Sequence, residues 1–175
     1  MDDLTQLAEL IKTRNRIAEE ITAVIGRPAL IGHVGEYIAS RIFAIDLEES
    51  ASQKSIDGHF TTGLLKGRSV NIKWYGKREG LLDITPDALP DFYLVLTGAK
   101  ASAMSSRGKT RPWLIKSVFL FDAPELCEAL RKRGIKMGVE TSVRQQHWQA
   151  AEVYPGHNAR LPLSDGQRRF LALFG

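Results

Sequence analysis

The chain of 175 residues has one cysteine, four histidines and no long apolar run. One cysteine excludes an intramolecular disulfide and argues against a cysteine-based zinc site. Cys127 lies in an expected helix, where a buried apolar role is favoured over that of a nucleophile. No apolar stretch approaches the roughly 18–20 residues of a membrane span, and no signal-peptide pattern opens the chain. These absences predict a cytoplasmic protein without a membrane partner.

The positive charge is concentrated in the later part of the chain. The formal net charge is +4, with −3 over residues 1–55 and +7 over residues 56–175. The sequence pI is about 9.3. A basic surface favours a polyanionic partner, so this asymmetry points to nucleic acid.

Length and patterning predict one domain over residues 1–175, divided into an N-terminal helix (1–30), a core (31–134) and a C-terminal extension (135–175). Apolar spacing and capping residues predict helices at about 4–25, 30–44, 122–134, 143–154 and from 164 onward. Strands are expected at about 53–60, 68–75, 91–97 and 113–121, with loops at 46–53 and 81–90. The pattern predicts a fold that combines helices with a sheet of about four strands.

Four polar residues near the first two expected strands could carry chemistry. Alternation along residues 68–75 puts Asn71 and Lys73 on one face, with Val70, Ile72 and Trp74 on the other. Asp57 ends the preceding strand, and Glu36 lies on the second expected helix. A nuclease that uses a divalent cation needs hard oxygen ligands for the ion and a cation near the scissile phosphate. Glu36, Asp57, Asn71 and Lys73 offer such a set.

Over residues 31–96 the chain resembles the restriction-endonuclease-like superfamily, the PD-(D/E)xK nucleases. Glu36 matches the acid of the first core helix, Asp57 the first half of the motif, and Asn71 with Lys73 the second half. The resemblance implies an α/β fold with a mixed central sheet and helices on both sides. It also implies Mg²⁺ or Mn²⁺ held by Glu36, Asp57 and Asn71, with Lys73 orienting water and stabilising charge.

Two positions depart from the motif of this superfamily. Asn71 stands at the second acidic position, and Ile56 stands where proline precedes the first acid. Asparagine offers a carbonyl oxygen without negative charge, which weakens Mg²⁺ binding unless Glu36 compensates. The site is therefore either a variant that uses Glu36 as its second acid or a degenerate site. His59, two residues after Asp57, is the one histidine that could neighbour it.

Basic and aromatic residues around this motif are candidates for DNA contact. A second reading of residues 103–110 is a phosphate-binding loop, but Ala103 replaces its leading glycine and Pro112 opens a strand-like segment where a helix should start. A basic surface loop fits this segment better. The candidate nucleic-acid contacts are Lys66, Arg68, Trp74, Lys77, Arg78, Arg107, Lys109 and Arg111. For Trp74 the alternative is packing in the core, which is favoured because it shares a strand face with Val70 and Ile72.

Three functions remain open from the residues alone. The first is a metal-dependent nuclease that hydrolyses DNA, and the second is a non-catalytic nucleic-acid-binding domain with a degenerate nuclease site. The third is a protein-interaction domain that uses the acidic first third of the chain. A homodimer is compatible with each of them.

Overall fold

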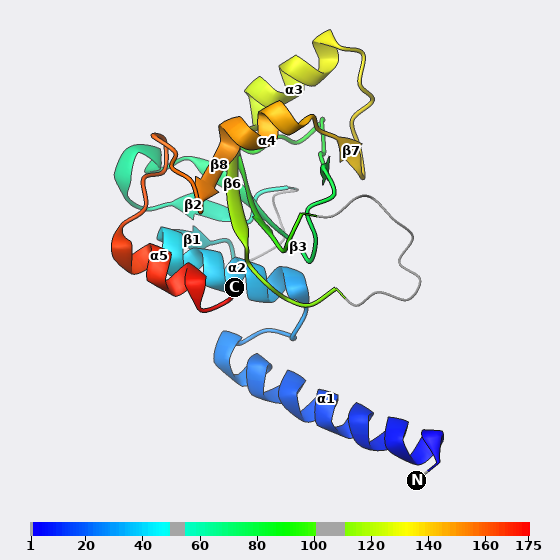
Figure 1. Ribbon diagram of the computed structural model, residues 1–175. Coiled ribbons are helices and arrows are strands. Elements are labelled where there is room, and N and C mark those ends of the chain that lie inside the picture. The colour runs from blue at the N-terminus through cyan, green and yellow to red at the C-terminus, as the bar shows by residue number, and fades with distance from the viewer. Residues whose placement is uncertain (1, 50–54, 101–110) are drawn as a thin grey trace.

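The computed structural model describes residues 2–49, 55–100 and 111–175, and its centre is a six-stranded mixed sheet (Figure 1). The strand order is β1-β2-β3-β5-β6-β8, and β3 and β5 are parallel while all other neighbours are antiparallel. The strands are β1 (Ile45–Leu47), β2 (Gly58–Phe60), β3 (Ser69–Tyr75), β5 (Phe92–Thr97), β6 (Ser117–Asp122) and β8 (Glu152–Tyr154). A separate two-stranded ribbon pairs β4 (Leu81–Leu82) with β7 (Thr141–Ser142).

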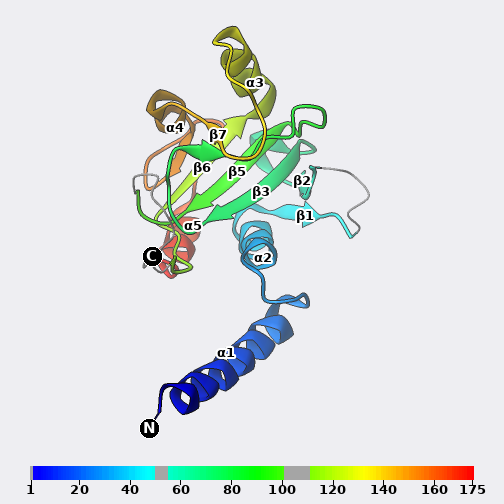
Figure 2. The same ribbon diagram turned by 90° about the vertical axis from the view of Figure 1, so that its right-hand side faces the viewer.

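Helices cover both faces of the main sheet (Figures 1 and 2). α2 (Ile31–Phe43) and α5 (Asp165–Ala172) pack on one face, and α3 (Ala123–Lys132) and α4 (Gln145–Ala151) pack on the other. A short 3₁₀ helix, η1 (Gly63–Leu65), lies between β2 and β3. The first helix, α1 (Asp3–Ile25), extends away from this body in both views.

The central strand β5 shows why the sheet needs helices on both sides. All six of its residues are buried. Phe92, Leu94 and Leu96 enter the core with α2 and α5, whereas Tyr93 and Val95 enter the core with α3 and α4. Because successive side chains of a strand point to opposite faces, a continuous apolar run requires cover on both. The expectation of a doubly covered strand here is confirmed.

Local signals located most helix ends. The Asp122 side chain caps α3 by accepting a hydrogen bond from the backbone N–H of Glu125, and Gly134 beyond the helix has a positive φ of 67°. Ser164 and Gln167 form a reciprocal capping box at the start of α5. Cys127 is fully buried on α3, in agreement with its expected packing role.

The predicted sheet is incomplete in two places. The main sheet has six strands rather than about four, because β1 and β8 were not recognised. β1 falls partly in the expected loop 46–53, and β8 falls at the end of the expected helix 143–154. Each has only three residues, and each gains its hydrogen bonds from a partner distant in the sequence, β2 for β1 and β6 for β8. Residues 50–54 of the expected strand 53–60, and residues 101–110, lie outside the described residues.

Candidate functional site

Asp57 lies immediately before β2 and binds the backbone of β3. Its own N–H donates to the Val70 carbonyl (2.9 Å), and its Oδ2 accepts a hydrogen bond from the Ile72 N–H (2.6 Å). The next residue must be small, because a Cβ on Gly58 would overlap the Asp46 carbonyl oxygen on β1. The Asp-Gly pair therefore fixes a carboxylate at the point where β2 joins β3.

The environment of Asp57 disfavours its charge. Burial raises the pKa of Asp57, the Ile72 N–H lowers it, and the negative charge of Glu36 raises it further. Smaller effects of Lys73 and Arg27 lower this pKa. The charges of Glu36, Lys73 and Arg27 therefore all act on the pKa of Asp57.

Asn71 and Lys73 lie on the face of β3 opposite Val70, Ile72 and Trp74, as the alternation predicted. Asn71 is only 8% exposed, and its Oδ1 has no hydrogen-bond partner among the described residues. The Lys73 Nζ lies 5.5 Å from the centre of the Tyr93 ring. Burial lowers the pKa of Lys73, while Asp83 and then Asp57 raise it. This face of β3 thus holds an unsatisfied carbonyl oxygen and a partly desolvated amine.

Glu36 approaches the site from α2. The helix crosses β3 closely at the preceding residue, because a Cβ on Gly35 would lie 3.0 Å from the Trp74 Cβ. Glu36 forms an ion pair with Arg27 from the connection between α1 and α2. Its carboxylate is therefore close enough to affect the pKa of Asp57 but already has a cationic partner.

Arg27 and Asp83 belong to this neighbourhood and were missed in the sequence. Asp83 follows β4, accepts a hydrogen bond from the Glu140 N–H (2.8 Å), and has the largest charge effect on Lys73. Its own N–H donates to the Tyr75 hydroxyl (3.0 Å). Asp83 lies in a segment expected to be a loop, and these two hydrogen bonds and the pairing of β4 with β7 hold it in place. Neither residue has a sequence signal that would have identified it.

His59 does not join Asp57. Its Nδ1 lies 3.1 Å from the Glu48 Oε1, and it pairs with Asp46 across β1 and β2. The contact with Glu48 accounts for its position.

The basic candidates divide between the two ends of β3. Lys66 and Arg68 precede this strand, and Arg68 pairs with Asp91 (2.9 Å). Lys77 and Arg78 follow it, and Arg111 pairs with Glu79 (3.1 Å). A strand of seven residues is about 20 Å long, so the two groups are separated by about that distance along β3. Arg107 and Lys109 lie outside the described residues.

Trp74 is a core residue, which corrects its assignment as a base-stacking side chain. It is 7% exposed, its ring packs on Gly35, and its Nε1 donates to the Leu114 carbonyl (3.1 Å). It points to the same face as Val70 and Ile72, toward α2. A ring held in this way has no face free for a base.

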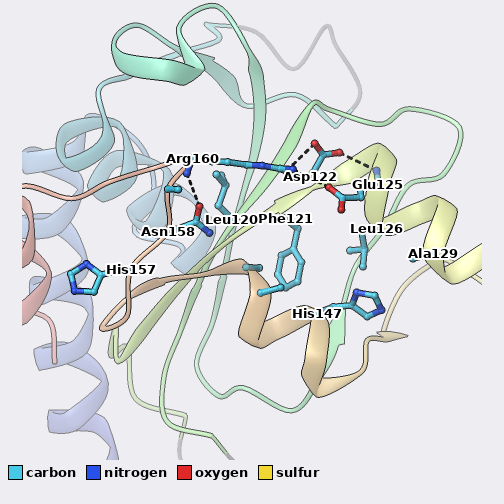
Figure 3. A pocket seen from close by; sticks show the side chains of 13 residues that line it. Leu120, Phe121, Asp122, Glu125, Leu126, Ala129, His147, His157, Asn158 and Arg160 are labelled. Carbon is cyan, nitrogen blue, oxygen red and sulfur yellow. Dashed lines mark hydrogen bonds and ion pairs between the residues drawn. The ribbon is translucent and has the colours of Figure 1, made fainter.

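A cavity of about 420 Å³ lies elsewhere, between α3, α4 and residues 157–160 (Figure 3). Arg160 spans its rim and forms ion pairs with Asp122 and Glu125, each at 3.2 Å. None of Glu36, Asp57, Asn71 and Lys73 lines it. Because both of these carboxylates already pair with the one guanidinium, the cavity does not indicate a particular ligand.

Replacing Asp57 with Asn is expected to stabilise the fold at neutral pH by about 1 kcal/mol. The amide keeps an oxygen for the Ile72 N–H and removes a buried charge beside Glu36. The pKa of Asp57 is 3.8 in the unfolded chain and higher in the folded protein. Between these two pKa values the folded protein binds more protons than the unfolded chain, so the free energy of unfolding of wild type falls as the pH rises. The advantage of the variant should therefore be complete at pH 7 and vanish below 3.8.

Urea unfolding at several pH values measures this difference, and Asp87→Asn, at an exposed carboxylate, is the matched control. A lower free energy of unfolding for Asp57→Asn at pH 7 would contradict the prediction and would mean that the charged carboxylate stabilises the folded state.

Among the described residues, no three His, Cys, Asp or Glu side chains are grouped as metal ligands. A metal here would therefore need Asn71 as a ligand in addition to carboxylates, and α2, which carries Glu36, packs on the face of β3 opposite Asn71. Within residues 2–49, 55–100 and 111–175, no helix has the length and apolar character needed to cross a bilayer. Neither a comparison with protein-family models nor one with curated proteins gave a match for this chain.

Proposed function

We propose that this chain is a metal-dependent nuclease of the restriction-endonuclease-like type that hydrolyses phosphodiester bonds of DNA. One observation carries the proposal: the partly desolvated Lys73 amine, whose pKa the charges of Asp83 and Asp57 raise, lies on the same strand face as the Asn71 oxygen, which is buried without a hydrogen-bond partner among the described residues. Perturbed ionisable groups of this kind gather at functional sites more often than elsewhere. The order of elements also supports it, since α2 is followed by β1, β2 and β3 within a mixed sheet flanked by helices.

The oxygen donors are of the chemical type that suits a hard divalent cation. Asn71 Oδ1 is buried without a partner among the described residues, and Asp57 and Glu36 provide carboxylates. Mg²⁺ and Mn²⁺ prefer such oxygens, so these three residues would hold the ion. It would supply positive charge against the scissile phosphate.

Lys73 would act on the phosphate and on water. Its ammonium would orient the attacking water by hydrogen bonding and offset the negative charge that builds on the phosphoryl oxygens in the transition state. Asp83 would keep the amine protonated, because its charge raises the pKa of Lys73 against the effect of burial. In the reaction water adds across a P–O bond, and the leaving oxygen takes a proton. Lys66 and Arg68 at one end of β3, and Lys77, Arg78 and Arg111 near the other, would contact the DNA backbone.

A second function is favoured by the pairing of Arg27 with Glu36. The Arg27 guanidinium pairs with Glu36 and lowers the pKa of Asp57. It therefore provides the positive charge that a bound metal would otherwise provide to these carboxylates. Together with asparagine at position 71, this arrangement suits a domain that binds DNA without cleaving it. Such a domain needs no ion at Asp57.

The deciding experiment incubates the wild-type protein with supercoiled, linear double-stranded and single-stranded DNA, with Mg²⁺ or Mn²⁺ and with EDTA. A nuclease cleaves at least one form only when the metal is present. The non-catalytic domain is identified if DNA is bound but not cleaved, if EDTA does not change the affinity, and if the affinity falls steeply with salt concentration. The salt dependence is expected because phosphate contacts release counterions from the DNA. If DNA is neither bound nor cleaved, both functions are wrong.

A further inference from the structure

Helix α1 carries a long apolar face that is exposed over most of its length, with Ala18, Ile21 and Ile25 toward its C-terminal end partly buried. None of its residues is buried, and six large apolar side chains are 48–78% exposed. These are Leu4, Leu7, Leu10, Ile11, Ile17 and Val24. In both ribbon views the helix projects from the body and approaches it only at its C-terminal end, next to α2 (Figures 1 and 2). An exposed apolar face of this length is a mark of an interaction site.

The spacing of this face is that of a helix-pairing seam. Its residues form three rows in steps of seven, which are Leu4-Ile11-Ala18-Ile25, Leu7-Arg14-Ile21 and Leu10-Ile17-Val24. The first two rows alternate by three and four residues, as positions a and d of a heptad do, and the third is position g. A seven-residue repeat over three heptads keeps one side of a helix facing another helix.

The charges of α1 disfavour a lipid surface as the occupant. Residues 3–25 contain four acidic and three basic side chains. Helices that lie on membranes are rich in lysine and arginine on their polar face, which attracts anionic lipid. A polar face of mixed sign with a small negative balance suits a protein partner instead.

We propose that α1 pairs antiparallel with the α1 of a second copy of this chain. In one register of a and d positions, Leu7 meets the second copy's Ile25 and Ile11 meets its Ile21. Arg14 then faces the small Ala18 and reaches toward Glu19, and Lys12 lies across from Glu20. A parallel, in-register pair would instead stack Arg14 on Arg14 within the apolar seam. The two-fold symmetry makes each contact twice.

The length of the helix limits the size of this contact. A helix of 23 residues is about 35 Å long and 10–12 Å across, so the side that it offers another helix is roughly 400 Å² in projection. This is smaller than a standard interface of about 800 Å² per partner, so we expect a dimer of modest affinity that forms at high protein concentration. The pairing is independent of the nuclease proposal and holds whether or not the chain cleaves DNA.

Light scattering after size-exclusion chromatography tests the pairing on the full chain. Wild type should have twice the 19.5 kDa mass of one chain. The double variant Leu10→Glu/Ile17→Glu should have the mass of a single chain and should retain its thermal unfolding transition, because both side chains are exposed in the monomer. The matched control Thr13→Glu/Ala23→Glu adds the same charges on the polar face and should remain a dimer. A dimeric Leu10→Glu/Ile17→Glu variant overturns the proposal.

Engineered cysteines test the direction of the pair. When Leu10→Cys and Val24→Cys proteins are mixed and oxidised, the antiparallel pair forms the mixed disulfide, since the only native thiol, Cys127, is buried. A parallel pair joins each variant to itself and overturns the antiparallel arrangement. A wild-type protein of single-chain mass at about 100 µM, roughly the range of weak specific dimers, overturns the pairing itself. Sedimentation of such a monomer with phosphatidylglycerol vesicles would then assign the face to a lipid surface.

Discussion

Replacing Lys73 with Met is expected to lower the rate of metal-dependent DNA cleavage by about 10²- to 10⁴-fold. The change removes a cation of β3 whose pKa the charges of Asp83 and Asp57 raise. Methionine is close to lysine in length and keeps the contact with the Tyr93 ring. Initial rates of plasmid cleavage at saturating DNA measure the effect on the chemical step.

The fold of this variant should be intact, so that lost cleavage reports lost chemistry. Burial lowers the pKa of Lys73 more than the two carboxylates raise it, so the charged amine carries a net cost in the folded state at neutral pH. Removing it is expected to leave the free energy of unfolding within about 1 kcal/mol of wild type. Lys132→Met makes the same change on an exposed residue of α3 and should cleave normally. Equal cleavage by Lys73→Met and wild type would exclude Lys73 from catalysis.

Local information was sufficient for the parts of the fold that carry their own signals. The heptad-like spacing of residues 4–25, the Asp122 cap and the Ser164 capping box each act within a few residues. The alternation in β3 likewise put Asn71 and Lys73 on one face. β1 and β8 could not be found in this way, because a strand of three residues is defined by its partner and not by its own pattern.

The candidate site shows the same division between local and long-range information. The resemblance named Glu36, Asp57 and Lys73, and all three contribute to one electrostatic neighbourhood. Arg27 and Asp83 come from a helix connection and from a ribbon formed with residues 141–142, so no spacing in the sequence relates them to Lys73. Trp74 was assigned to DNA contact because aromatic and basic residues are adjacent there, although strand alternation directs its ring into the core.

Replacing Trp148 with Ala is expected to reduce the free energy of unfolding by about 3–5 kcal/mol, a large part of the stability of a domain. Trp148 is 1% exposed, and its ring stands edge-on to Phe119 (4.8 Å between centres) and to Phe121 (4.9 Å). These contacts join α4 to β6 beneath α3. Alanine would leave a cavity among aromatic rings and leave the Val143 carbonyl without its indole donor.

Trp113 provides the matched control because it is the same residue type at 41% exposure, tilted against Trp74 at 5.9 Å. Trp113→Ala should cost about 1 kcal/mol, since 41% of the Trp113 surface is already in contact with water and the residue lies outside the buried core. Guanidinium unfolding curves of the three proteins measure both changes, with an unchanged slope showing that the same cooperative unit unfolds. Similar losses for the two variants would mean that the aromatic cluster around Trp148 is not a main source of stability. A large loss of stability for Trp148→Ala alone would show that the packing of α4 on β6 is a main source of stability. This packing lies on the face of the sheet opposite α2.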